Sequence, residues 1–267
     1  MHITIGKPYA ASEKGGRANN EDFIFPAPEA VGTNQKLFIV CDGVGGANKG
    51  EVASAMACEC FYSFLSSFFD GYMDAAIINK ALQYTEVNFD EYIRNNPEAI
   101  GMGTTLALLF FSPKGITVAH IGDTRIYHFR NGRILHQTED HSLVYSLYKL
   151  NTIKKEEMRT HPQRNIILRA IQGNDNPTEA EVNLLTDIKD GDFLFMCTDG
   201  VFEVFTDDEL SELFNGQHSA EECKDILIET CNGETKDNFS FYIIPVQHVR
   251  ESESLTQNIL SFFYSLV

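Results

Sequence analysis

The feature that most constrains the fold is a series of short apolar runs separated by turn residues. The runs are rich in β-branched and aromatic residues, which predicts buried β-strands. Ser-Pro-Lys-Gly (112–115) and Arg-Asn-Gly-Arg (130–133) are typical of hairpin turns and predict an antiparallel meander from 105 to about 138. The predicted strands cover residues 37–41, 105–111, 116–122, 125–129, 193–198 and 239–246.

Apolar residues at helical spacing mark other parts of the chain. The region 142–172 has little β signal and is predicted to be helical. Antiparallel strands with helices inserted in pairs predict an α+β fold in one compact domain. The best-marked helices cover 50–69, 74–94, 207–214 and 219–231, and the last of these begins with the Ser-x-x-Glu pattern of a capping box at Ser219 and Glu222.

Composition and charge exclude several classes of protein. The 21 basic and 38 acidic residues give a net charge of −17, which argues against a nucleic-acid partner or an anionic membrane. The six cysteines show no CxxC spacing, which fits a reducing compartment rather than a disulfide framework or a zinc site. The sequence shows no apolar signal segment, and no stretch reaches the ~20 apolar residues that span a bilayer. We therefore expect a cytoplasmic protein.

The predicted domain covers residues 1–247, followed by a tail at 248–267. After a polar start at 251, the tail sequence favours a short helix that docks on its own domain. A helix that binds a partner is the alternative.

Aspartates lie at the ends of several predicted strands. Asp42 and Asp199 follow apolar runs and precede glycines, Asp123 follows a glycine, and Asp237 comes just before the last run. Each aspartate alone is typical of a turn. Carboxylates brought together would favour a hard divalent cation such as Mg²⁺ or Mn²⁺, which prefers oxygen ligands. Convergence of these residues would require the fold, so both interpretations stay open at this point.

Two further patterns concern phosphate. The stretch 45–50 (GGANKG) has the glycine spacing of a phosphate-binding loop, but Glu51 and Val52 stand where that motif needs Lys and Ser or Thr. Arg17 lies shortly before Glu21 and Asp22, and an arginine fork suits a phosphate dianion. The alternative for Arg17 is a surface ion pair.

Taken together, the motifs resemble those of the metal-dependent protein phosphatases of the 2C type, especially the bacterial members. The match runs from about residue 13 to 247. The resemblance implies a four-layer α-β-β-α sandwich of two antiparallel sheets flanked by helices. The motifs are RANNED (17–22), VCDGVGG (40–46), GMGTTL (101–106), IGDTR (121–125), TEDHS (138–142), HPQRN (161–165), CTDG (197–200) and DN (237–238).

The resemblance also implies a centre of two Mn²⁺ or Mg²⁺ ions between the sheet edges. Asp42 would bridge both ions, and the Gly43 carbonyl would bind one of them. Asp199 and Asp237 would hold the other ion. Asp123, together with Asp199, matches the residues that support a third and weaker ion in bacterial relatives.

Other roles follow from the same resemblance. Arg17 would bind the substrate phosphate, and Glu21 and Asp22 would bind a metal directly or through water. Residues 142–172 match the flap beside the active site, a region tied to substrate choice. Val44 stands where animal relatives often carry a histidine proposed as the general acid, which leaves the proton donor unassigned.

The predicted activity is hydrolysis of phosphoserine and phosphothreonine in proteins by a water that bridges the two ions. The predicted partners are phosphorylated proteins, substrates of a serine/threonine kinase, and neither nucleic acid nor membrane. The alternatives are an inactive phosphoprotein-binding pseudophosphatase and a phosphatase of small metabolites. The GMGTT stretch is assigned to a tight strand entry outside the site. His141 and His161 match positions of the family, and both a structural hydrogen-bonding role and a catalytic role stay open for them. His120 is assigned to a strand.

Overall fold

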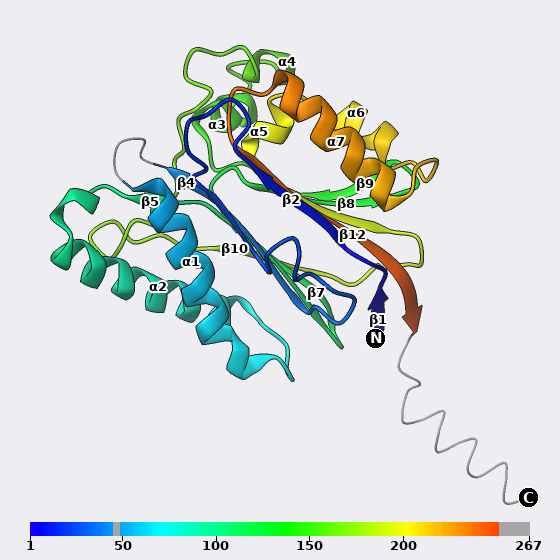
Figure 1. Ribbon diagram of the computed structural model, residues 1–267, viewed down its shortest axis with the longest axis horizontal. Coiled ribbons are helices and arrows are strands. Elements are labelled where there is room, and N and C mark those ends of the chain that lie inside the picture. Colours follow the sequence, from blue (N-terminus) through cyan, green and yellow to red (C-terminus); the bar gives the residue numbers. More distant parts are fainter. Residues whose placement is uncertain (45–48, 251–267) are drawn as a thin grey trace, which may run out of the picture.

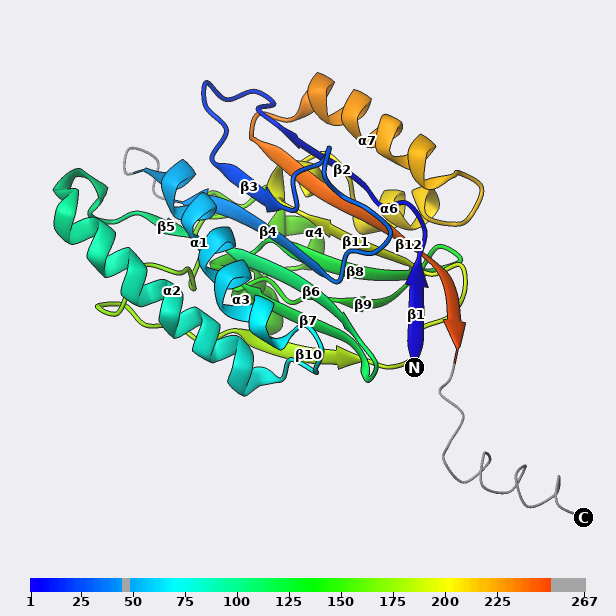
Figure 2. The ribbon, with the colours of Figure 1, turned by 60° about the horizontal axis from the view of Figure 1, so that its bottom comes forward.

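The computed structural model describes residues 1–44 and 49–250. Its centre is a pair of antiparallel sheets that pack face to face, and helices cover the outer face of each sheet (Figure 1, Figure 2). This arrangement confirms the predicted α+β fold with four layers, α-β-β-α.

The first sheet, called sheet I, contains β1 (His2–Ile5), β2 (Tyr9–Glu13), β8 (Arg125–Arg130), β9 (Arg133–Gln137), β11 (Phe193–Cys197) and β12 (Phe239–Arg250). Its strand order is β1-β12-β11-β8-β9, and β2 also pairs with β12. Sheet II contains β3 (Asp22–Phe25), β4 (Leu37–Val44), β5 (Gly103–Thr104), β6 (Leu106–Ser112), β7 (Gly115–Ile121) and β10 (Glu181–Leu185). Its order is β10-β7-β6-β4-β3, and β5 also pairs with β4.

The helices form the two outer layers. Sheet II is covered by α1 (Gly50–Leu65) and α2 (Ala75–Asn95), and sheet I by α5 (Asp199–Phe202), α6 (Asp207–Leu213) and α7 (Ala220–Glu234). The capping box predicted at the start of α7 is present, with Ser219 as the N-cap. The flap region contains the short helices α3 (Leu143–Lys149) and α4 (Lys155–Met158), and single-turn 3₁₀ helices cover Ser66–Phe68 and Pro97–Ala99.

Strand β4 shows why the apolar runs have no polar alternation. Phe38 and Val40 pack in the core between the two sheets, whereas Ile39 and Cys41 pack in the core under α1. All four side chains are fully buried. A strand covered on both faces needs apolar residues at every position. The rigid strand then places Asp42 two residues before its end.

The predicted meander from 105 to about 138 is wrong in its connectivity. Strands β6 and β7 form a hairpin in sheet II, whereas β8 and β9 form a hairpin in sheet I. The chain crosses between the sheets at 122–124, where Gly122 has a φ of +94° and a Cβ would lie 2.6 Å from Thr105 Cγ2. Two hairpins in separate sheets can face each other and bury the apolar side chains between them, which one flat meander could not do.

Several elements differ from the predictions in extent. The strands β1, β2, β3, β5 and β10 were missed; none is longer than five residues, and none is a continuous apolar run. Region 142–172 is helical only in α3 and α4, and Ser142 and Ile167 form an isolated bridge across it. Strand β12 continues to Arg250. The predicted tail helix at 251–267 lies outside the described residues. Within residues 1–44 and 49–250, no helix is long and apolar enough to cross a membrane.

Candidate active site

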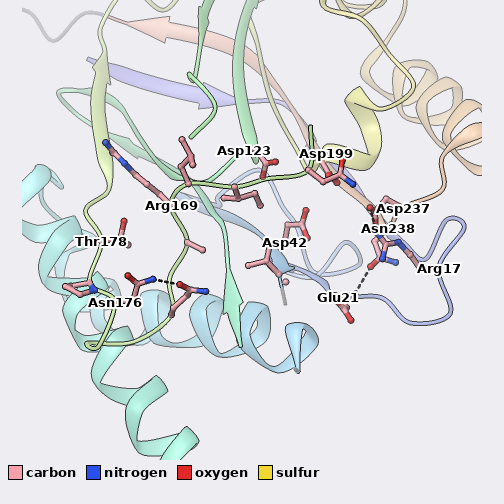
Figure 3. Close-up of a pocket in the computed structure, with 18 residues that line it drawn as sticks. Arg17, Glu21, Asp42, Asp123, Arg169, Asn176, Thr178, Asp199, Asp237 and Asn238 are labelled. Carbon is pink, nitrogen blue, oxygen red and sulfur yellow. Dashed lines mark hydrogen bonds and ion pairs between the residues drawn. The ribbon is translucent and has the colours of Figure 1, made fainter. Parts of the chain in front are cut away.

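The aspartates at the strand ends converge on one open cleft of about 510 Å³ (Figure 3). Asp42 lies near the end of β4, whereas the other three follow β7 and β11 or precede β12, so both sheets contribute to the cleft. The convergence that the sequence could not establish is therefore present. The predicted site residues that line the cleft are Arg17, Glu21, Asp42, Gly43, Asp123, Asp199 and Asp237.

Asp42 is held by its backbone. Its N–H donates to Thr105 Oγ1 at 2.9 Å, and its carbonyl accepts from Thr105 N at 2.9 Å and from Thr104 Oγ1 at 2.8 Å. Both threonines are fully buried and belong to the GMGTT stretch, which was predicted to lie outside the site. Their role is positioning. A pair of threonines at a strand entry gives no sequence signal for this, because their partners are backbone atoms 62 and 63 residues away.

Gly43 follows in a position that excludes any side chain. A Cβ at Gly43 would lie 2.3 Å from the Gly50 carbonyl oxygen and 2.7 Å from the Glu21 carbonyl oxygen. The Gly43 N–H donates to that Glu21 carbonyl at 3.0 Å. The glycine thus allows β4, the start of α1 and the Glu21 loop to meet beside the cleft.

Asp22 lies behind the cleft rather than in its lining. It is paired with Asp42 in the β3–β4 register and is 6% exposed. Its Oδ2 accepts from the Thr198 hydroxyl at 2.8 Å, while its Oδ1 has no partner among the described residues. The predicted choice between direct and water-mediated contact with a metal is not decided by these contacts.

Without a cation, the negative charges of the aspartates in and behind the cleft are unfavourable, because these groups are buried close to one another. Burial raises the pKa of Asp22 and of Asp123 to about 7. Burial and neighbouring carboxylates hold the pKa values of Asp42 and Asp199 well above the usual range. Asp123 Oδ1, like the free oxygen of Asp22, is buried without a partner among the described residues. Buried carboxylate oxygens without a balancing positive charge are suitable ligands for hard divalent cations.

Arg17 supplies a positive charge at the rim of this cluster. Its Nη2 donates to Asp237 Oδ2 at 2.5 Å, which raises the pKa of Arg17. The Arg17 side chain is 55% exposed, so it can turn toward a ligand in the cleft. The surface ion pair and the phosphate-binding role considered for Arg17 are therefore compatible.

Asn238 fixes the loop that carries Arg17 and Glu21. Its Oδ1 accepts from Glu21 N at 2.9 Å, and its Nδ2 donates to the carbonyls of Lys14 and Asn19 at 2.9 and 2.7 Å. An amide can accept and donate at once, which a second aspartate could not do. Asn238 stands in the DN motif, but sequence reasoning gave it no role.

The other wall of the cleft comes from the flap and from a loop beyond it. Residues 165 and 167–170 line the cleft, and so do Asn176 and Thr178, which lie outside the predicted flap of 142–172. Two acids on α2 hold this outer loop. Asp90 accepts from Asn174 N at 3.1 Å, and Glu86 accepts from Thr178 N at 3.2 Å. In Figure 3, Arg169 and Arg17 lie on opposite sides of Asp42.

Comparison with known proteins agrees with this geometry. The family described as Protein phosphatase 2C matches residues 12–235. A serine/threonine phosphatase, Stp, of Listeria welshimeri is 30% identical over 202 residues, covering 74% of this chain and 79% of the relative. The crystal structure of the Mycobacterium tuberculosis serine/threonine phosphatase PstP/Ppp superposes with a TM-score of 0.78 at 28% identity, covering 92% of this chain and all of that one.

A structure of the PstP catalytic domain in complex with two manganese ions is also similar, with a TM-score of 0.75 at 26% identity, covering 92% of this chain and 100% of that one. The fold and the cleft define a phosphatase scaffold. This chain belongs to the protein phosphatase 2C family and is a protein phosphatase, which confirms the resemblance seen in its motifs.

Proposed function

We propose that this protein removes phosphate from phosphoserine and phosphothreonine in proteins, with the help of two Mn²⁺ or Mg²⁺ ions. The observation that carries the proposal is the meeting of four aspartates from the strand ends in one cleft, where burial raises the pKa of Asp42, Asp123 and Asp199. The names of the relatives and the two manganese ions in the PstP complex support the same activity.

The chain's own oxygen atoms fit the two ions. Bound in the cleft, the ions supply activation of a water for attack on phosphorus and neutralise phosphoryl charge. The described residues that line the cleft include no serine, cysteine or histidine, which supports water as the nucleophile. The residues that would hold the ions are Asp42, Gly43, Asp199 and Asp237, with Asp123 for a third ion and Glu21 and Asp22 in direct or water-mediated contact.

Arg17 would position the substrate. Its guanidinium can leave Asp237 once that carboxylate has a cation, and can then bind two oxygens of the phosphate. Val44 lines the cleft and offers no proton. The proton for the serine or threonine oxygen that leaves therefore has to come from a group other than residue 44.

We further propose that the partners are phosphoproteins made by a serine/threonine kinase, that the protein works in the cytoplasm, and that residues 1–247 form the catalytic unit. The open cleft supports a protein substrate, because a phosphorylated side chain must enter while its own backbone stays outside.

The test compares hydrolysis of phosphoserine and phosphothreonine peptides with Mn²⁺ and with EDTA. Wild-type protein should be active only with the metal. Asp199→Asn should lose Mn²⁺ binding and activity yet remain folded, because one ligand is replaced by an amide of the same shape. Asp225→Asn is the matched control, since Asp225 is an exposed aspartate on α7, with 65% of its side chain accessible.

Folded wild-type protein with no metal-dependent turnover would contradict the proposed activity. Near-normal turnover by Asp199→Asn would contradict the assignment of that ligand. A panel of small phosphorylated metabolites should be hydrolysed less efficiently than the peptides, and the reverse order would favour a metabolite phosphatase.

A further inference from the structure

His141 joins the turn that carries Asp123 to the flap. Its backbone N–H donates to the Gly122 carbonyl at 2.9 Å, and its ring Nδ1 accepts from the Gly122 N–H at 3.2 Å. Both backbone groups of Gly122 are thus bound by one residue. On its other side, the His141 carbonyl accepts from Leu168 N at 2.7 Å, and Leu168 lines the catalytic cleft.

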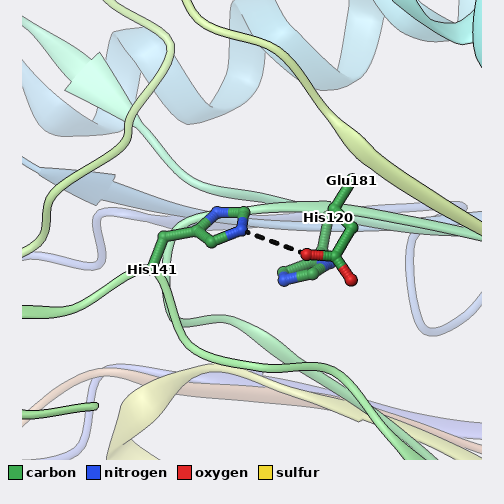
Figure 4. Close-up of side chains that lie close together, drawn as sticks. All are labelled: His120, His141 and Glu181. Carbon is green, nitrogen blue, oxygen red and sulfur yellow. Dashed lines mark ion pairs between the residues drawn. The ribbon is translucent and has the colours of Figure 1, made fainter. Parts of the chain in front are cut away.

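The contacts of the ring define its tautomer. Because Nδ1 accepts a hydrogen bond, the neutral ring carries its proton on Nε2. That atom lies 3.6 Å from Glu181 Oε2 (Figure 4). It also lies 3.5 Å from Arg169 Nη1, which is itself a donor and therefore contacts the protonated Nε2 without a hydrogen bond. The ring also stacks on His120, with centroids 4.5 Å apart, and His120 is itself fixed because its Nε2 donates to the Glu139 carbonyl at 2.9 Å. The His141 ring is therefore held on several sides.

The same side chains could be considered for a transition metal. Ligand atoms of His120, His141 and Glu181 lie within 4.8 Å of one another, and His120 Nδ1 is buried without a partner among the described residues. The His141 tautomer argues against a metal, because the nitrogen that faces Glu181 carries the proton. The neighbouring Arg169 guanidinium would also repel a cation. The contacts favour a hydrogen-bonded link.

We propose that His141 is a positioning residue that couples Asp123 to the part of the flap that carries Arg169. The proposal rests on the proposed function, in which Asp123 would support a third ion in the cleft that Leu168 and Arg169 also line. Gly122 has no side chain that could fix its position, and none could be added there. Its φ is +94°, and a Cβ would lie 2.6 Å from Thr105 Cγ2. The orientation of Asp123 therefore depends on the two hydrogen bonds between His141 and Gly122.

The two ring nitrogens have different tasks in this proposal, so two substitutions can separate them. In His141→Asn, the side-chain oxygen can take the place of Nδ1 and keep the bond to Gly122, but the ring edge that lies against Glu181 and Arg169 is lost. In His141→Gln, a polar group reaches the place of Nε2, but the Gly122 N–H loses its acceptor. His136→Asn is the control, because His136 lies on the neighbouring strand β9 and its Nε2 has no partner among the described residues.

The readouts are Mn²⁺ binding by calorimetry, hydrogen exchange of the Gly122 amide, and KM for a phosphopeptide. His141→Gln should weaken the weakest Mn²⁺ site by about five- to tenfold and expose the Gly122 amide to exchange, as expected for the loss of one buried hydrogen bond. His141→Asn should leave the Mn²⁺ affinity and the Gly122 exchange rate within about twofold of wild type, while it raises KM for the phosphopeptide. The control should change none of the three.

Equal shifts of the same readouts in both His141 variants would overturn the proposal, because a merely structural ring would not separate the two tasks. Stoichiometric Zn²⁺ binding by the wild type that is lost in Glu181→Gln would also overturn it and assign the cluster to a metal. If the wild type showed no phosphatase activity, the proposed function would fail, yet Gly122 exchange and Mn²⁺ binding would still test the role of His141.

Discussion

The metal-free protein should become more stable when Asp123 is replaced by asparagine, and the gain should depend on pH. Asp123 is 6% exposed, and burial, followed by the charge of Asp140, raises its pKa from 3.8 to about 7. The folded protein therefore holds this proton more tightly than the unfolded chain does. The corresponding stability is present below the unfolded pKa near 3.8 and is lost as the pH rises through about 7.

The size of the effect follows from the shift. About three pKa units at about 1.4 kcal/mol each give an upper bound on the order of 4 kcal/mol for keeping Asp123 charged at pH 8. The neutral amide of the Asp123→Asn variant would not bear this cost. For a chain of this size, each kcal/mol moves the melting temperature by about 2–4 °C, so the gain in EDTA at pH 8 should be roughly 5–15 °C.

The assay is thermal unfolding of wild type and Asp123→Asn in EDTA at pH 5 and pH 8, repeated with Mn²⁺. The difference should be clearly larger at pH 8 than at pH 5, where only about a third of the pKa interval between 3.8 and about 7 has been crossed. Mn²⁺ should stabilise the wild type more than the variant. Asp225→Asn serves as the exposed control and should show no pH-dependent gain. A difference between wild type and Asp123→Asn that is the same at both pH values would refute the electrostatic reasoning.

Two other substitutions test separate parts of the site. Arg17→Ala should raise KM for phosphopeptides with a smaller effect on kcat, because it removes a phosphate contact and leaves the proposed metal ligands in place. Arg133→Ala is the control, since Arg133 is an exposed arginine on β9. An unchanged KM in Arg17→Ala would speak against the role of Arg17. Thr105→Val should lower the free energy of unfolding by about 1–3 kcal/mol, since the Asp42 N–H would lose its buried acceptor and the Thr124 hydroxyl would lose its partner. Chemical denaturation measures this free energy. Thr85→Val is the control and should lower it less, because the Thr85 hydroxyl donates only to a carbonyl of its own helix. Equal losses in the two variants would show that the buried bonds of Thr105 do not stabilise the fold more than a bond within a helix.

The sequence predicted the elements whose environment is uniform. Strand β4 is covered on both faces, so its apolar run was recognisable, and Asp42 at its end was identified as a candidate ligand. The crossing between sheets at 122–124 was not predictable, because a turn within a sheet and a turn between sheets use the same residue types. Strand β3 was missed since it has only four residues, one of which is Asp22.

The supporting residues of the site were also missed, for a different reason. Thr104 and Thr105 act on the backbone of Asp42, and Asn238 acts on the backbone of the Arg17 loop. Such bonds connect positions that are far apart in the chain, and the partner contributes no characteristic side chain. The family resemblance assigned the ligands, but only the structure shows what keeps them in place.

The position of the cleft between two sheets ties the geometry of the site to the packing of distant side chains. Asp42 belongs to sheet II, whereas Asp199 and Asp237 adjoin sheet I, so the separation of the ligands is set by how the sheets slide over each other. That registry depends on contacts such as the edge-to-face pair of Phe38 and Tyr242, with centroids 5.2 Å apart. A substitution in this buried layer would alter the spacing of these carboxylates without touching the cleft.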